Sequence, residues 1–357
     1  MKQHLNNLER LRAGTYRDIS KGIFLDRNER AMDYNKDILD KLWKHLADNV
    51  RLGLYPEMVP FYNKLSNWLG LPENQIFVTD GVCSGIKSLI EAISEPGQKI
   101  IFPTPTFSLY PVYGQMFQQE CITVGYTKDY RLNVDQLLDS IDDDTSILFL
   151  PNPNVPISGT LDIDTIRTIA EQCSLHNAFL AVDEVYYPFG GPTAIELINE
   201  YDNLFILRSF SKAFGLAGIR VGYVLGSADN IDYVSKVRTG YENNSVCMEI
   251  ASFFIDHFYL IEGYINEVKE GFEYLKEYLD KFNLTYVGGT EGNFLFVELG
   301  NKDNVNELTA KLKERDIYIR NGWPAPFDTG FAITGAPVKV MEKFVQGFLE
   351  VYSGIMS

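Results

Sequence analysis

Residues 209–220 read Ser209-Phe-Ser-Lys212-Ala-Phe-Gly-Leu-Ala-Gly-Ile-Arg220. This stretch places a lysine directly after Ser211 and three positions after Ser209, with an arginine eight positions further on. The amine can form an imine with an aldehyde cofactor, while the hydroxyls and the guanidinium can hold that cofactor's phosphate. A lysine taken alone is most simply a solvated side chain on a loop. The interpretation of Lys212 therefore depends on what the rest of the chain supplies.

Short apolar runs alternate with helical patterns on both sides of this stretch. The runs are continuous rather than alternating, which indicates strands of a sheet that is buried on both faces. They cover residues 75–79, 99–102, 146–150, 178–182 and 204–207, with helices predicted at 85–94 and 163–176. This is the α/β pattern, and in open α/β sheets the ligand binds beyond the carboxyl ends of the strands.

The pattern changes towards both ends of the chain. A helical spacing covers residues 34–51, and the first 33 residues resemble an arm. After about residue 233 a long helix, either straight or kinked, is predicted over 246–279, followed by strands at 293–297 and 317–319 and a final helix from 338. We therefore expect an N-terminal arm (1–33), a large cofactor-binding domain (34–235) and a small α+β domain (236–357).

Composition limits the possible partners. The 357 residues carry a net charge of −16, which disfavours nucleic acid and anionic membranes, since both need a cationic surface. The N-terminus lacks a signal-peptide core, and no run of about 18 apolar residues occurs. The four cysteines and four histidines are scattered, so neither a disulfide framework nor a metal site is expected. A cytoplasmic setting is the simplest interpretation.

Asp183 ends one predicted strand, and Tyr186 follows three residues later. An aspartate there can pair with a protonated pyridine nitrogen, which keeps the ring cationic and able to absorb electrons when a bond to the substrate Cα breaks. Tyr186 could donate to the ring's phenolate oxygen. The structural alternative for Asp183 is a helix N-cap, a common role for an aspartate after a strand.

Three further strand ends carry polar or aromatic turns. The Gly81 turn (79–84) precedes a helix, where free N–H groups can bind phosphate. The 103–110 segment could place Tyr110 or Phe107 over a flat ring, although core packing is the usual role of such residues. The 151–159 turn could point an amide at the cofactor, or simply form the turn.

Together these motifs resemble the fold-type-I pyridoxal-phosphate enzymes, the class I/II aminotransferases, and within them the histidinol-phosphate aminotransferase branch. The resemblance runs from about Gly22 to the C-terminus. It implies a large domain with a mostly parallel seven-stranded sheet between helices and a smaller α+β C-terminal domain. The matching stretches are 54–57, the Gly81 turn, 105–110, 152–159, 182–186 and the Ser-x-Ser-Lys-x-x-x-x-x-Gly-x-Arg pattern of 209–220.

The resemblance also implies roles for single residues. Lys212 would hold pyridoxal 5'-phosphate and shuttle a proton, with Asp183 on the pyridine nitrogen and Tyr186 and Asn154 on the ring oxygen. Tyr110 would stack on the ring. Tyr55 would reach the phosphate of a neighbouring subunit's coenzyme, which implies a homodimer with shared active sites. The residues expected around the coenzyme's own phosphate are Gly81, Val82, Cys83, Ser209, Ser211 and Arg220.

The chain departs from the family pattern where the substrate binds. Val155 replaces the second of two adjacent asparagines, and Ala332 stands where an arginine normally pairs with a substrate anion. Arg320 matches a second substrate arginine. The arm carries Arg27 and Arg30 around Asn28 in place of neutral residues. We hypothesise that the positive charge of the substrate site has moved to the arm, so that Arg27, Asn28, Arg30 and Arg320 face an anionic substrate. The alternative is that both arm arginines lie on the surface.

Three functions fit these residues. The first is an aminotransferase that moves an amino group between a donor and a keto or aldehyde acceptor, with a small, phosphorylated or otherwise anionic substrate. The second is a decarboxylase of a phosphorylated amino acid, because the bond that breaks depends on how the substrate is anchored. The third is a cofactor-binding regulatory protein without turnover, which the acidic charge and the reactive lysine disfavour.

Overall fold

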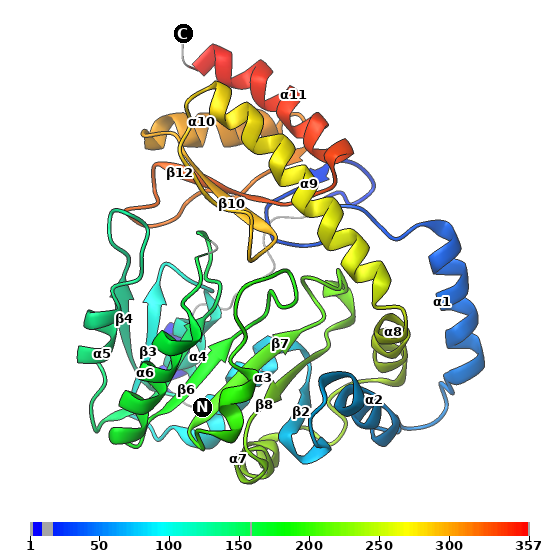
Figure 1. The fold of residues 1–357 in the computed structure, drawn as a ribbon, viewed down its shortest axis with the longest axis vertical. Helices are drawn as coiled ribbons and strands as arrows, with labels where there is room; N and C mark the ends of the chain where they lie inside the picture. Colours follow the sequence, from blue (N-terminus) through cyan, green and yellow to red (C-terminus); the bar gives the residue numbers. More distant parts are fainter. Residues whose placement is uncertain (1–2, 9–16, 158, 356–357) are drawn as a thin grey trace.

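A seven-stranded sheet forms the larger part of the molecule (Figure 1). The computed structural model describes residues 3–8, 17–157 and 159–355. The strand order is β2-β8-β7-β6-β5-β3-β4, and only β8 runs antiparallel to its neighbours. This confirms the predicted mostly parallel sheet. The strands are β2 (Ile76–Thr79), β3 (Lys99–Thr104), β4 (Glu120–Gly125), β5 (Thr145–Pro151), β6 (Phe179–Asp183), β7 (Leu204–Ser209) and β8 (Gly222–Leu225).

Helices bury both faces of this sheet, which explains the continuous apolar runs. Along β6, Leu180 and Val182 belong to one core cluster and Ala181 belongs to the other. The Ala181 side packs against α3 (Gly81–Ile93), α4 (Leu109–Met116) and α7 (Ala228–Val234). The opposite side packs against α2 (Val59–Leu69), α6 (Ile163–Leu175) and α8 (Ser245–Asp256). Successive strand residues point to opposite faces, so a strand covered on both faces has no polar positions to alternate.

A smaller antiparallel sheet of order β12-β10-β9 lies towards the C-terminus, with α9 (Tyr259–Lys281), α10 (Lys302–Lys313) and α11 (Val338–Ile355) around it (Figure 1). Its strands are β9 (Tyr286–Gly288), β10 (Phe294–Glu298) and β12 (Gly330–Thr334). The N-terminal segment is joined to this part of the molecule, because β1 (Ile23–Phe24) pairs in parallel with β11 (Ile317–Tyr318). The arm is therefore fixed where it approaches the large sheet.

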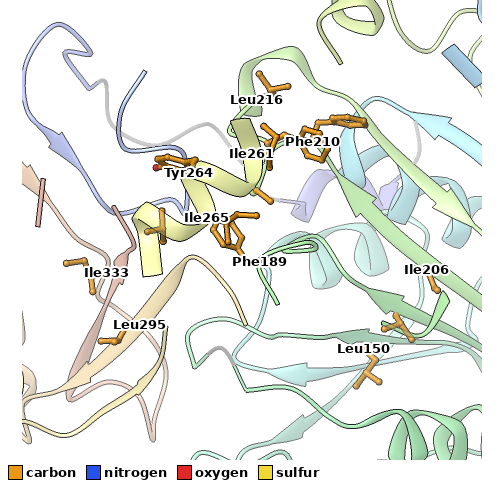
Figure 2. Close-up of a cluster of buried hydrophobic side chains, with 14 of the residues drawn as sticks. Leu150, Phe189, Ile206, Phe210, Leu216, Ile261, Tyr264, Ile265, Leu295 and Ile333 are labelled. Carbon is orange, nitrogen blue, oxygen red and sulfur yellow. The ribbon is translucent and has the colours of Figure 1, made fainter. Parts of the chain in front are cut away.

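Helix α9 connects the two sheets through one apolar core. Figure 2 shows Ile261 and Ile265 of α9 beside Phe210 and Phe189, which come from loops of the large sheet. Residues of the small sheet belong to the same cluster. The remaining helices are α1 (Lys36–Asn49) and α5 (Val134–Asp139), and short 3-10 turns lie at Gln3–Asn7, Glu73–Gln75, Ile195–Asn199, Ala217–Ile219 and Ser235–Val237.

Some elements differ from the sequence prediction. The single helix expected over 246–279 is two helices, because α8 ends at Asp256 and α9 starts at Tyr259. Strands β4 and β8 were not predicted: β4 is largely half-exposed, and β8 has only four residues. In the part of the chain that the structure describes, no helix is both long and apolar enough to span a bilayer.

Candidate active site

The site lies where several strands of the large sheet end together. The parallel strands β5, β6 and β7 finish at Pro151, Asp183 and Ser209, and Pro151 is in register with Asp183. Gly222, the first residue of β8, pairs with both Thr79 and Ser209. The end of β2 therefore lies at the same edge. This is the carboxyl edge at which α/β sheets bind ligands, and the predicted site residues follow these strand ends.

Lys212 follows β7 on a loop and is half-buried. Its Nζ donates a hydrogen bond of 2.9 Å to the carbonyl oxygen of Arg27 and lies 5.9 Å from the ring centroid of Tyr186. Desolvation of the amine lowers the pKa of Lys212 to about 8, with the positive charges of Arg320 and Arg220 acting in the same direction and Glu29 opposing them. A substantial fraction of the amine is therefore neutral and nucleophilic near neutral pH.

This lowered pKa predicts how fast the coenzyme-free protein condenses with pyridoxal phosphate. Since the neutral amine reacts, the rate should rise up to about pH 8 and then level off. With a pKa of 8, about one-tenth of the amine is neutral at pH 7, against roughly one part in 3,000 for an ordinary lysine. Stopped-flow absorbance measures the rate, with free Nα-acetyl-lysine as the control. A rate that keeps rising to pH 10, as for the control, would contradict the assignment.

Asp183 is a buried carboxylate, only 3% exposed. Its Oδ2 accepts a 2.6 Å hydrogen bond from the Tyr110 hydroxyl, and its Oδ1 accepts one of 3.1 Å from the Val185 N–H. Burial raises the pKa of Asp183 to about 6. The Val185 contact caps a turn and not a helix, because no helix directly follows β6 in the described chain, so the helix N-cap considered above is not formed. Both carboxylate oxygens keep free lone pairs. A buried carboxylate of this kind is stabilised by a nearby cation, which a protonated ring nitrogen would provide.

The structure corrects the prediction that Tyr110 stacks on the coenzyme ring. Tyr110 is completely buried and stacks on Phe102 and Phe149, at centroid distances of 5.7 and 5.0 Å. Its ring therefore has no free face, and its hydroxyl is committed to Asp183. Phe107, the other aromatic residue considered, is only partly buried. Phe107 is the better candidate for a ring contact, and Tyr110 orients the carboxylate.

The residues predicted to bind phosphate converge at the start of α3. Gly81 begins this helix with φ +67°, and the N-cap Asp80 makes no side-chain capping bond. A Cβ at Gly81 would collide with the guanidinium of Arg220. Arg220 Nη1 lies 3.4 Å from Ser211 Oγ and Nη2 3.9 Å from Cys83 Sγ, while Ser209 Oγ lies 2.9 Å from Ser211 Oγ. These groups form an anion-binding site, called the anion cradle below. It consists of the N–H groups at the start of α3, including that of Val82, the hydroxyls of Ser209 and Ser211, and the guanidinium of Arg220.

Close backbone packing makes this cradle possible. A Cβ at Gly222 would lie 2.7 Å from the backbone nitrogen of Val82, so only glycine lets β8 approach the helix start this closely. Sequence reasoning did not select Gly222. It also missed the buried ion pair behind the site, in which Arg208 donates to Glu184 at 2.8 and 3.0 Å. That ion pair links the ends of β6 and β7. In the sequence, the only indication of it is that a charged residue lies next to Asp183 and another next to Ser209.

The arm crosses the site and is hydrogen-bonded to both parts of the molecule. Asn28 Nδ2 donates to the Tyr186 hydroxyl at 2.8 Å, and the Asn28 backbone N–H donates to Thr334 Oγ1 at 2.9 Å. Asn293 Nδ2 donates to the Asn28 carbonyl oxygen at 3.1 Å. Asn28, predicted near the substrate, is therefore at the site, where it orients Tyr186. Burial raises the pKa of Tyr186, so its hydroxyl stays protonated.

Asn154 does not have the free amide that the predicted ring contact requires. Its Nδ2 donates to the carbonyl oxygen of Pro105 at 2.8 Å and to the Tyr126 hydroxyl at 2.7 Å. Its Oδ1 accepts from Thr106 at 2.8 Å. Both amide hydrogens are thus used within the protein. The prediction of a ring contact is corrected accordingly: Asn154 fixes the 151–159 turn to neighbouring loops.

The two arm arginines of the hypothesised cationic site are placed differently. The Arg30 guanidinium lies between the rings of Tyr34 and Tyr264, with Cζ 4.0 and 3.6 Å from their centroids, and its Nε donates to the Met32 carbonyl oxygen. Arg27 Nε lies 3.6 Å from Asp26, and it is the Arg27 backbone carbonyl that meets Lys212. Arg30 is therefore half-buried rather than on the surface, and two aromatic faces already hold its cation. The positive charge of Arg27, in contrast, acts on Arg320, so a substrate role for Arg27 remains a hypothesis.

Replacing Arg30 with alanine should consequently reduce stability more than activity. The change removes two cation–π contacts and the packing of the side chain against Gly215, which together stabilise the fold by roughly 1–3 kcal/mol. We expect a lower Tm in thermal unfolding, with kcat/KM reduced by less than about 1 kcal/mol in equivalent free energy. Arg30→Lys, which retains the charge, is the control. A large fall in kcat/KM at unchanged Tm would restore the substrate role.

Two other predicted residues occupy distinct places. Arg320 is exposed, forms a two-way backbone bridge with Ala332, and lies with Cζ 4.2 Å above the Trp323 ring. Its positive charge also contributes to the lowered pKa of Lys212. Tyr55 is 76% exposed and stacks on Tyr241 at 4.7 Å. Tyr55 therefore does not join the site of its own chain, and its contact with a second subunit remains a prediction.

The fold and the site define an α/β enzyme built around a buried, reactive lysine and an anion cradle. The model of the family described as aminotransferase class I and II matches residues 20–337. The chain is 28% identical over 300 residues to the histidinol-phosphate aminotransferase of Caldanaerobacter subterraneus subsp. tengcongensis, covering 83% of each chain. It is 30% identical over 275 residues to histidinol-phosphate aminotransferase 1 of Trichormus variabilis, covering 76% of each.

Among solved structures, the histidinol-phosphate aminotransferase of Sinorhizobium meliloti in complex with pyridoxal-5'-phosphate superposes with a TM-score of 0.84 at 19% identity, covering 93% of this chain and 91% of the other. The chain thus belongs to the aminotransferase class I and II family. It is a transaminase with pyridoxal phosphate as its coenzyme. The anion cradle, the amine of Lys212 and the buried carboxylate of Asp183 fit the phosphate, the aldehyde and the ring nitrogen of that coenzyme.

Proposed function

We propose that the protein is a histidinol-phosphate aminotransferase-like enzyme, transferring an amino group between a small phosphorylated or otherwise anionic amine and a keto or aldehyde acceptor. The observation that carries the proposal is the position of Lys212. Its amine, with a pKa of about 8, lies at the same sheet edge as the buried Asp183 and the uncapped start of α3. The names of the curated relatives support the phosphorylated substrate.

Each residue of the site has a specific role in this proposed reaction. Bound pyridoxal phosphate supplies an electron sink for the bond that breaks at the substrate Cα. Lys212 would hold the coenzyme covalently and would move a proton at that carbon. Asp183, oriented by Tyr110, would keep the ring nitrogen protonated, and Tyr186, oriented by Asn28, would donate towards the ring oxygen. The cradle of Gly81, Val82, Cys83, Ser209, Ser211 and Arg220 anchors the phosphate, while Arg320 faces the substrate's anion.

We further propose a cytoplasmic homodimer. Several large apolar side chains around Tyr55 are exposed, namely Leu52, Leu54 and Val59. Exposed apolar residues gathered in this way favour association with another protein surface. A second copy of the chain would cover them and bring Tyr55 to the neighbouring site. The arm, large domain and small domain, with boundaries near residues 33 and 235, would be the units of each subunit.

The test is an amine screen with the coenzyme-loaded protein. Loading is first verified by the absorbance of the bound coenzyme. Candidate donors, including histidinol phosphate, glutamate and simple phosphorylated amines, are then added one at a time without acceptor. A donor should convert the coenzyme stoichiometrically to its amine form, and a keto acid should reverse the change. Release of CO₂ without an acceptor would instead establish the decarboxylase, and no spectral change with any amine would contradict both.

A further inference from the structure

One face of the small sheet is directed at the site. Ala332 is paired with Phe296 on β10 and bridged to Arg320, and Thr334 is paired with Phe294. Directly paired residues, and residues two apart along a strand, share a face. Phe294 packs against Tyr186 with tilted rings at a centroid distance of 4.7 Å, and Thr334 Oγ1 accepts a hydrogen bond from the Asn28 N–H. Residues 294, 296, 320, 332 and 334 therefore all face the catalytic end of the large sheet.

Apolar side chains fill this face beside Ala332. Ala332 forms a buried cluster with Trp323, Phe296, Phe327 and Ile157, of which the last comes from the 151–159 turn that follows β5. Val155 packs against the same cluster. The small side chain of Ala332 thus occurs in the same cluster as the large side chain of Trp323, which is consistent with the close packing of protein interiors.

Trp323 carries the one feature that this packing leaves unexplained. It is 7% exposed, and among the described residues its Nε1 has no hydrogen-bond partner. A buried N–H group without a partner costs about 1–3 kcal/mol, so such groups in native proteins call for an explanation. The guanidinium of Arg320 lies 4.2 Å above the same ring. The indole N–H and the guanidinium N–H groups are therefore neighbouring donors on the site-facing side of the small sheet.

Arg320 is also available for a ligand. No carboxylate lies within ion-pair distance of its guanidinium in the described part of the chain, whereas Arg17, Arg167 and Arg208 each have such a partner. Stacking on an aromatic ring holds the planar guanidinium without using its N–H groups. Two adjacent donors with unused N–H groups fit an oxyanion, and the side chains directly beside Ala332 are apolar.

We propose that Trp323 is a specificity-determining residue. Its indole N–H and the guanidinium of Arg320 together bind a single oxyanion of the substrate, and its ring fills the space beside Ala332 so that a second anionic group is excluded. The substrate class is an amine with one carboxylate or phosphate group. This rests on the proposed function, because the oxyanion belongs to the substrate of that reaction.

The first experiment measures anion binding to the coenzyme-loaded protein. Inorganic phosphate and acetate are titrated separately, to distinguish a phosphate from a carboxylate, and isothermal titration calorimetry measures binding, because the variant lacks the emission of Trp323. Trp323→Phe keeps the ring but loses the N–H, and should weaken the preferred anion roughly 10-fold or more, as for a hydrogen bond to a charged group. Trp43→Phe, at an exposed tryptophan on α1, is the matched control and should change nothing.

The second experiment uses the unaltered protein and does not depend on how the variant folds. Anion binding should change the emission of Trp323, and succinate should bind no more than about twofold more tightly than acetate, since only one oxyanion is held. Unchanged anion affinity in a folded Trp323→Phe protein would overturn the proposal, as would a 10-fold preference for succinate. Because coenzyme loading is verified first, failure to load would count against the proposed function alone.

Discussion

Replacing Lys212 with alanine is expected to lower kcat by at least about 10³-fold, because the change removes both the covalent attachment of the coenzyme and the proton carrier at the substrate carbon. The anion cradle does not involve the Lys212 side chain, so the variant should still bind pyridoxal phosphate as the free aldehyde. Single-turnover kinetics with the donor found in the amine screen measure the loss, and absorbance measures the bound aldehyde.

Lys212→Arg is the matched control for this substitution. It keeps a positive charge and a long side chain but cannot form the imine, so its activity should be as low as that of Lys212→Ala. Below pH 8 and without coenzyme, the Tm of Lys212→Ala in thermal unfolding should be equal to or higher than that of the unaltered protein. The reason is that the substitution removes a desolvated ammonium group, which destabilises the folded state. Activity within 10-fold of the original in either variant would contradict the role of Lys212.

Replacing Asp183 with asparagine should reduce kcat by at least about 10²-fold, since a neutral amide cannot keep the ring nitrogen protonated. The shape of the side chain is retained, and Tyr110 can still donate to the amide oxygen. Without coenzyme and above pH 6, the Asp183→Asn protein should be no less stable than the unaltered protein. The raised pKa of Asp183 means that the folded state holds a costly carboxylate there, and its ionisation reduces the free energy of unfolding as the pH rises from about 4 to 6.

Tyr110→Phe provides the graded comparison for Asp183. It removes the 2.6 Å hydrogen bond but leaves the carboxylate in place, so the loss of kcat should be smaller, roughly 10-fold. Initial rates at saturating donor and acceptor measure both effects. A larger loss for Tyr110→Phe than for Asp183→Asn would show that the tyrosine acts in some way other than by orienting the carboxylate.

The large sheet was readily predictable, because each central strand is an apolar run covered on both faces. The run at 178–182 needed no long-range information to be recognised. Strand β8 was missed because its apolar run Tyr-Val-Leu lies between Gly222 and Gly226, and glycine is depleted in strands. Strand β4 was missed because an edge strand retains polar residues such as Glu120. The break between α8 and α9 at residues 257–258 carries neither glycine nor proline, so no local signal marked it.

The site was predictable in its parts and less so in its details. Strand-end positions were enough to bring Lys212, Asp183 and the cradle together, because the carboxyl ends of parallel strands meet at one edge. They could not show which hydrogen bonds each side chain makes. Asn154 and Tyr110 are at the expected loops but use their polar groups within the protein. Arg30 is held by Tyr264, 234 positions away in the sequence, and only the folded chain reveals such a contact.

The most direct test of the central claim is to reduce the coenzyme-loaded protein with borohydride and to locate the modification by peptide mass spectrometry. Reduction fixes the imine as a stable secondary amine, so one pyridoxyl group per chain should be found on the peptide that contains Lys212. The characteristic absorbance of the bound coenzyme should disappear at the same time. A label on another lysine, or no label on a protein that has bound the coenzyme, would contradict the account.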